Sequence, residues 1–128
     1  MKRAVTISVA PGGLLVQGLG RPKEVQLPEE VLKWASDPAV LTMLEDILED
    51  PGFRAHVTTT GALQSLVMLL YAIYIGVPPY KAAKSLGTSH ERLYRLERGL
   101  KKEGLYYMIR SRLEILRALK GNIDVSRW

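Results

Sequence analysis

Residues 79–102 read PYKAAKSLGTSHERLYRLERGLKK, and this stretch decides the fold. Residues 81–86 contain two alanines and predict a short helix, because alanine has the highest intrinsic helix propensity. Gly87 adopts left-handed backbone angles without steric cost, so we expect this helix to end there. A second helix should begin almost at once, since Thr88 and Glu91 have the spacing of a capping box.

The second of these helices is expected to bury one face and expose the other. Leu93, Leu96 and Leu100 recur at intervals of three and four residues, which places them on one side of a helix. Leu86 of the first helix should join the same core. The two helices must cross steeply at so short a turn, and Ala83 supplies the small side chain that a close crossing needs. The residues expected to point outward are Glu91, Tyr94, Arg95, Arg98 and Lys102, with His90 and Arg92 on the two flanks.

This arrangement resembles the helix-turn-helix superfamily of DNA-binding domains. The positions that match its small, turn and core residues are Ala83, Gly87, Leu93 and Leu96. The resemblance covers about a third of the chain and implies binding of double-stranded DNA, with the second helix in the major groove. It extends to residues 103–105, Glu-Gly-Leu, which are similar to the end of the recognition helix in winged-helix regulators. A β-wing follows in those proteins.

The residues after Leu105 predict a helix in place of a wing. Apolar side chains keep helical spacing from Leu105 to Lys120, and no Gly, Pro or Asn that would turn a hairpin occurs before Gly121. We expect Gly121 and Asn122 to end this helix. Its broad apolar stripe would either cover the helix-turn-helix core or pair with the same helix of a second copy. Trp128 is then an anchor or part of a disordered tail.

Binding through this unit predicts two sets of DNA contacts. Base edges would be read from the first turns of the second helix, which lie deepest in the groove, and arginine can form two hydrogen bonds with guanine. Candidates for base contacts are Ser89, His90, Arg92 and Arg95. Candidates for phosphate contacts are Lys81, Lys84, Arg98, Lys101 and Lys102. An ion pair between Glu91 and Arg95 would contribute only about 0.3 kcal/mol and would not block a DNA contact.

The charge of the chain is distributed unevenly. Its 128 residues carry a net charge of +5, with 47% apolar and 24% charged side chains, which is typical of one globular domain. Residues 1–56 hold 6 Lys and Arg against 8 Asp and Glu, whereas residues 57–128 hold 12 against 5. The positive potential of the second part would attract a phosphate backbone, while the acidic part faces away from it. The alternative is a charged, solvated surface with no binding role.

Catalytic and metal chemistry find little support in the composition. The chain contains no cysteine, which removes disulfides and thiolate nucleophiles and agrees with a reducing cytoplasm. His56 and His90 are the only histidines, and neither lies in a catalytic arrangement with Ser, Asp or Glu. We therefore expect no enzymatic activity, no metal site and no cofactor. Asn122 is the only asparagine, and Arg, Lys and Glu carry the polar surface, a bias of heat-adapted proteins that indicates a thermophile.

Alternating side chains predict a three-stranded β-meander at the N-terminus. Residues 4–9 alternate branched apolar side chains with Thr and Ser, and a Pro-Gly-Gly turn follows at 11–13. Residues 14–17 and 24–27 supply two more short strands. The Gly-Leu-Gly at 18–20 is interpreted as a turn, because the third glycine of a dinucleotide-binding fingerprint is missing.

A second resemblance lies where the third strand leads into a helix. Residues 25–32, Val-Gln-Leu-Pro-Glu-Glu-Val-Leu, are similar to ribbon-helix-helix DNA-binding proteins, in which strands from two chains pair and read the major groove. Two strand candidates precede this one, and the helix from Pro28 is expected to stop near Ser36, which is short for that fold. An ordinary junction of strand and helix is the simpler interpretation.

A helix is expected from Pro38 to about Asp50, capped by Asp37 and ended by Asp-Pro-Gly at 50–52. Four acidic residues should lie on its outer face, and with no histidine nearby a solvated face is a better account than a metal site. These residues are Glu45, Asp46, Glu49 and Asp50.

Residues 57–80 carry no charged side chain, which raises the question of a membrane span. A span needs about 20 apolar residues, and this stretch is diluted by Thr, Gln and Ser and closed by prolines. We expect a helix buried on all sides that packs on its own domain with one face and on a second subunit with the other. The N-terminus shows strand alternation and no signal peptide, so we expect a cytoplasmic protein.

The sequence as a whole predicts an α+β fold that is mostly α. A β-meander with acidic helices would span 1–56, and a basic helix-turn-helix with a C-terminal helix would span 57–128, together forming one compact unit. The expected function is a homodimeric transcriptional regulator that binds double-stranded DNA. The alternatives are an assembly subunit that contacts protein, an architectural nucleoid protein with little sequence preference, and binding of single strands by stacking on tyrosines.

Overall fold

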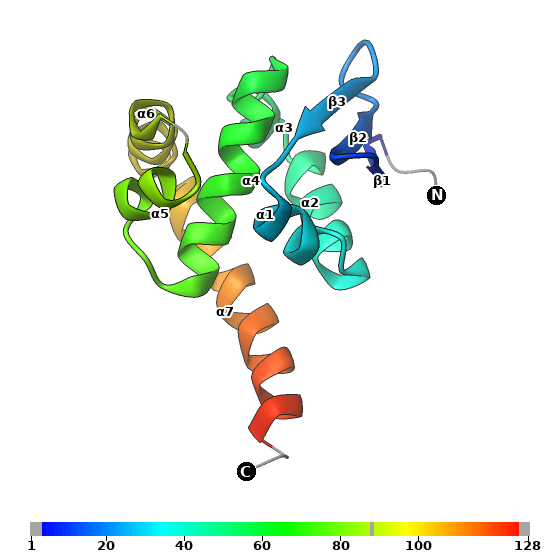
Figure 1. The fold of residues 1–128 in the computed structure, drawn as a ribbon. Helices are drawn as coiled ribbons and strands as arrows, with labels where there is room; N and C mark the ends of the chain where they lie inside the picture. The colour runs from blue at the N-terminus through cyan, green and yellow to red at the C-terminus, as the bar shows by residue number, and fades with distance from the viewer. Residues whose placement is uncertain (1–3, 88, 126–128) are drawn as a thin grey trace.

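The computed structural model describes residues 4–87 and 89–125, which form a three-stranded sheet followed by helices (Figure 1). The sheet is an antiparallel meander of β1 (Thr6–Ala10), β2 (Gly13–Gln17) and β3 (Lys23–Gln26). Ile7 pairs with Val16 and Leu14 pairs with Val25, and all four side chains are buried. Alternate residues of the strands therefore share one buried face, and the predicted meander is confirmed.

Helices make up the rest of the described chain and surround one central helix, α4 (Figure 1). The sheet and the first three helices lie on one side of α4, and α5 and α6 lie on the other. The helices are α1 (Glu29–Ala35), α2 (Pro38–Glu49), α3 (Pro51–Arg54), α4 (Thr60–Ile75), α5 (Pro79–Ser85), α6 (His90–Lys102) and α7 (Leu105–Val125). The fold is thus mostly helical, with an N-terminal β-meander, as predicted.

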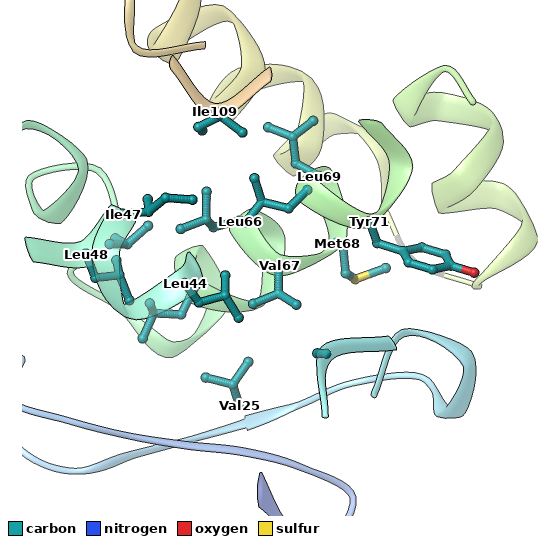
Figure 2. Close-up of a cluster of buried hydrophobic side chains, with 14 of the residues drawn as sticks. Val25, Leu44, Ile47, Leu48, Leu66, Val67, Met68, Leu69, Tyr71 and Ile109 are labelled. Carbon is teal, nitrogen blue, oxygen red and sulfur yellow. The ribbon is translucent and has the colours of Figure 1, made fainter. Parts of the chain in front are cut away.

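The core is one continuous cluster built around α4. In Figure 2, side chains from α2, β3 and α7 gather around the α4 residues Leu66 and Val67. Every α4 residue from Leu66 to Leu70 is at most 5% exposed, and five consecutive residues point in all directions around a helix. The chain alone therefore covers α4. The inference that one face of this helix needs a second subunit is wrong, because β3, α1, α5, α6 and α7 already contact it.

No single described helix is long and apolar enough to cross a membrane. Only α4 and α5 taken together meet the length and composition of a span, and they are bent by 110° at the break between them.

The acidic residues of α2 bind the edge of the sheet, so the prediction of a solvated acidic face is wrong. The Glu45 carboxylate accepts a hydrogen bond from the Ile7 backbone N–H at 2.8 Å, and Glu49 accepts one from Val5 at 3.2 Å. Strand β1 lies at the edge of the sheet, where N–H groups lack a neighbouring strand and need other acceptors. Asp46 lies 3.8 Å from the Arg112 guanidinium on α7.

Helix α3 and the last turns of α7 also differ from expectation. Asp50 ends α2 but accepts a hydrogen bond from the Gly52 N–H at 2.7 Å, which starts the short helix α3. Helix α7 continues past Gly121 to Val125, because a glycine inside a helix costs only about 1 kcal/mol and does not force an end. Trp128 lies outside the described residues. Strand β3 pairs within its own chain and α1 has seven residues, so the ribbon-helix-helix resemblance finds no support.

Asp37 joins the start of α2 to α7. Its carboxylate accepts a hydrogen bond from the Ala39 N–H at 2.8 Å and another from the Lys120 ammonium group. The bond from Lys120, followed by the bond from Ala39, lowers the pKa of Asp37 below its ordinary value. The predicted cap is confirmed, and it also ties down the long C-terminal helix.

Replacing Asp37 with Asn tests this link, because Asn keeps the N-cap and removes the negative charge. We expect the free energy of unfolding at neutral pH to fall by roughly 0.2–1 kcal/mol, the usual range for a partly exposed ion pair. The pKa of Asp37 is lower in the folded protein than its unfolded value of about 3.9, so the ionised carboxylate stabilises the fold at pH values above this unfolded pKa. This stabilisation is lost as the pH falls through the pKa of the folded protein. Urea unfolding should therefore show the two proteins converging in acid, and a constant gap would contradict the assignment.

Candidate nucleic-acid interface

A tight turn joins α5 to α6, as the sequence predicts. Helix α5 ends at Ser85, and Gly87 has a φ of +69°, in the left-handed region. The N-cap of α6 is Ser89, whose side chain makes no capping hydrogen bond. Thr88, the expected cap, lies outside the described residues. With the cap at Ser89, the third helical position is Arg92 instead of Glu91.

Three leucines hold α6 against the rest of the protein. Leu93, Leu96 and Leu100 are all buried, and Ala83 of α5 is fully buried at the crossing of the two helices. Leu86 is partly buried beside them. These contacts confirm the predicted core face of α6. They also determine the direction of its other face, because a straight helix cannot rotate without exposing its leucines.

The opposite face of α6 is cationic and open to solvent. All nine residues proposed to contact DNA are exposed: Ser89, His90, Arg92, Arg95, Lys81, Lys84, Arg98, Lys101 and Lys102. Within the described residues, Lys101 pairs with Glu97 at 3.9 Å, and the Arg98 guanidinium lies 5.5 Å from the Tyr94 ring centre. Over the same residues, Arg92 and Arg95 form no ion pair within 4.0 Å, so the pair between Glu91 and Arg95, considered as an alternative, does not form.

A cavity of about 650 Å³ lies between α6 and the first turn of α4. Arg92 and Arg95 line it from α6, and one Arg92 guanidinium nitrogen lies 3.0 Å from the position that a Gly61 Cβ would occupy. The other lining residues are His56, Thr59, Ala62, Ser65 and Leu96. The structure thus brings two arginines proposed as base readers together with residues more than 25 positions earlier in the chain.

A second depression of about 580 Å³ continues along α6. It is lined by Arg95, Arg98, Gly99, Lys101 and Lys102, and Arg95 belongs to both hollows. Cationic residues of α6 from Arg92 to Lys102 therefore line two hollows that meet at Arg95. Lys81 and Lys84 line neither hollow and stand apart on α5.

His56 is a structural residue of this site. Its imidazole bonds to the Glu103 carboxylate just after α6, and it lies against Gly99, whose added Cβ would come within 3.3 Å of the ring. The loop before α4 is thereby held along α6. Among the described residues, no group of three or more His, Cys, Asp or Glu side chains could hold a metal ion. The chemistry that the site offers is attraction and hydrogen bonding to oxyanions by guanidinium groups.

Comparison with protein-family models, with curated proteins and with solved structures gave no match.

Replacing Gly87 with Ala tests the turn that orients α6. A Cβ at this position meets no atom within 4 Å, so the cost comes from the backbone angle alone. We expect a loss of about 1–2 kcal/mol in the free energy of unfolding for Ala, and a smaller loss for Asn, which tolerates left-handed angles better. Chemical denaturation of the three proteins measures this. Equal stability of all three would show that the turn does not require glycine.

Proposed function

We propose that the chain binds double-stranded DNA as a transcriptional regulator, with α6 in the major groove. The observation that carries this proposal is the exposed cationic face of α6, which buried leucines hold in one orientation. A helix presented on a turn with its basic face outward matches how helix-turn-helix proteins dock on DNA. Electrostatic attraction to the phosphate backbone supplies most of the affinity in such complexes.

The position of each cationic residue suggests its role in the complex. Ser89 and His90 stand at the N-terminal end of α6, the part that lies deepest in a major groove. Arg92 and Arg95 follow within two turns and complete the set of proposed base contacts. Phosphate contacts are proposed for the remaining cations, which are Lys81, Lys84, Arg98, Lys101 and Lys102.

We also propose that two copies assemble through α7. Its last turns project beyond the rest of the protein (Figure 1). Met108, Ile115 and Leu119 form an exposed apolar stripe along the length of the helix, from its first turn to Leu119. Ile115 and Leu119 border an apolar groove of about 460 Å³ between α7 and α2. Stripe and groove lie on the same face, so a twofold axis would place the stripe of each copy in the groove of the other.

Charge reversal on α6 tests DNA binding. We expect the double variant Arg95→Glu with Arg98→Glu to abolish binding and to remain folded, because both side chains are exposed. The matched control is Arg110→Glu with Arg117→Glu, which changes the net charge equally on α7 and should leave binding largely intact. Random-duplex selection at two salt concentrations gives the readout. About six phosphate contacts predict a slope near −5 of log affinity against log salt.

Other outcomes of the same experiment point to other functions. Equal affinity for selected and random duplexes would indicate an architectural protein. Absence of duplex binding at low salt would reject the proposal and favour a subunit that contacts protein.

The dimer is tested by placing charge in the apolar stripe of α7. Ile115→Glu with Leu119→Glu should yield a folded monomer, because a carboxylate cannot be buried in an apolar groove without a partner. The control is Val9→Glu at an exposed valine of the sheet, which should not change the molecular mass in solution. Light scattering or sedimentation measures the mass. A monomeric wild-type protein, or a dimeric double variant, would contradict this arrangement.

A further inference from the structure

Positive groups converge on the cavity between α4 and α6 from two opposite walls. One wall carries the Arg92 and Arg95 guanidinium groups. The other wall is the first turn of the sixteen-residue helix α4, whose N-terminus bears a partial positive charge. The Thr59 hydroxyl accepts a hydrogen bond from Ala62 at 3.1 Å, and within the described residues the N–H groups of Thr60 and Gly61 have no acceptor.

This convergence places like charges close together, which is electrostatically unfavourable. The Arg92 guanidinium lies close to Gly61, so a full positive charge faces the positive end of a helix. None of the residues that line the cavity is acidic, and neither arginine is paired with a carboxylate of the described chain. An anion between the two walls would convert this repulsion into two attractions.

We infer that the cavity binds a phosphate group, held between the first turn of α4 and the guanidinium groups of Arg92 and Arg95. Backbone N–H groups at a helix start and bidentate arginines are both suited to phosphate oxygens. The second depression continues the positive surface from Arg95 to Lys102, which suits a ligand with several phosphates better than a single carboxylate.

The phosphate has two sources that this chemistry does not separate: a free phosphorylated compound, or the backbone of a bound duplex. The second source rests on the proposed function. In that case Arg92 and Arg95 contact phosphate and not base edges, which leaves Ser89 and His90 as the residues that read sequence.

Inorganic phosphate and the variant Gly61→Asp test the site directly. Aspartate in the first turn of α4 favours the helix and places a permanent carboxylate beside Arg92. We expect this variant to melt at a higher temperature than the wild type and to lose phosphate binding. At matched ionic strength, phosphate should raise the melting temperature of the wild type relative to chloride.

Arginine variants complete the phosphate experiment. Arg92→Ala should weaken phosphate binding roughly tenfold or more, because it removes a charge-assisted pair of hydrogen bonds. The control Arg110→Ala removes an exposed arginine of α7 that lines neither hollow, and it should bind phosphate like the wild type. Phosphate binding that Gly61→Asp and Arg92→Ala leave unchanged would overturn the inference.

A duplex arm distinguishes this inference from the proposed function. If the DNA backbone occupies the cavity, Arg92→Ala should weaken the binding of all duplexes equally and lower the magnitude of the salt slope by about 1. His90→Ala should instead change the sequence preference. Phosphate binding without duplex binding would support the site and reject DNA binding. A third outcome is that the protein binds duplexes, that Arg92→Ala alters the base preference, and that inorganic phosphate does not bind. This result would reject the phosphate site and support DNA binding.

Discussion

The all-round burial of α4 is the constraint on which the other elements depend. Each of its leucines gains roughly 1.5–3 kcal/mol on burial, so every neighbouring element is held where it covers one of them. The N-terminal sheet and α1 cover one side, and the last three helices cover the other. Helix α6 is therefore fixed by the same contacts that bury α4. Leu93, Leu96 and Leu100 face inward, so the arginines between them point to solvent.

Contacts of the acidic residues within the fold determine which basic side chains remain without an acidic partner. The acidic residues of α2 and its cap are used internally. Glu45 binds β1, and Glu49 binds Val5 just before that strand. Asp46 and Asp37 lie beside Arg112 and Lys120 of α7. Cations of α7 are thus partly neutralised by the N-terminal half. Those of α6 keep most of their charge, so the positive field is concentrated on one helix and not spread over the basic half.

Patterns within one helix or turn were predictable from sequence, and contacts between distant segments were not. The leucines of α6, the bend at Gly87 and the Asp37 cap depend on neighbours within a few residues, and the structure confirms them. The role of Glu45 depends on an edge strand about 40 residues away, and the cavity joins residues 56–65 to α6. No local spacing encodes such pairs. The extension of α7 past Gly121 shows the converse, since glycine permits a helix end without enforcing it.

The cavity also bears on how a duplex would be read. Phosphate contacts set the register of a protein on DNA, and base contacts discriminate sequence only once that register is set. A phosphate held by α4 and α6 together would engage the central helix of the core as well as the helix proposed to enter the groove. Because α4 cannot shift without exposing its leucines, that phosphate would be held by a helix that the core fixes in place. Under the proposed function, the short N-terminal end of α6 can then discriminate bases with only two residues, since the position of the backbone is already determined.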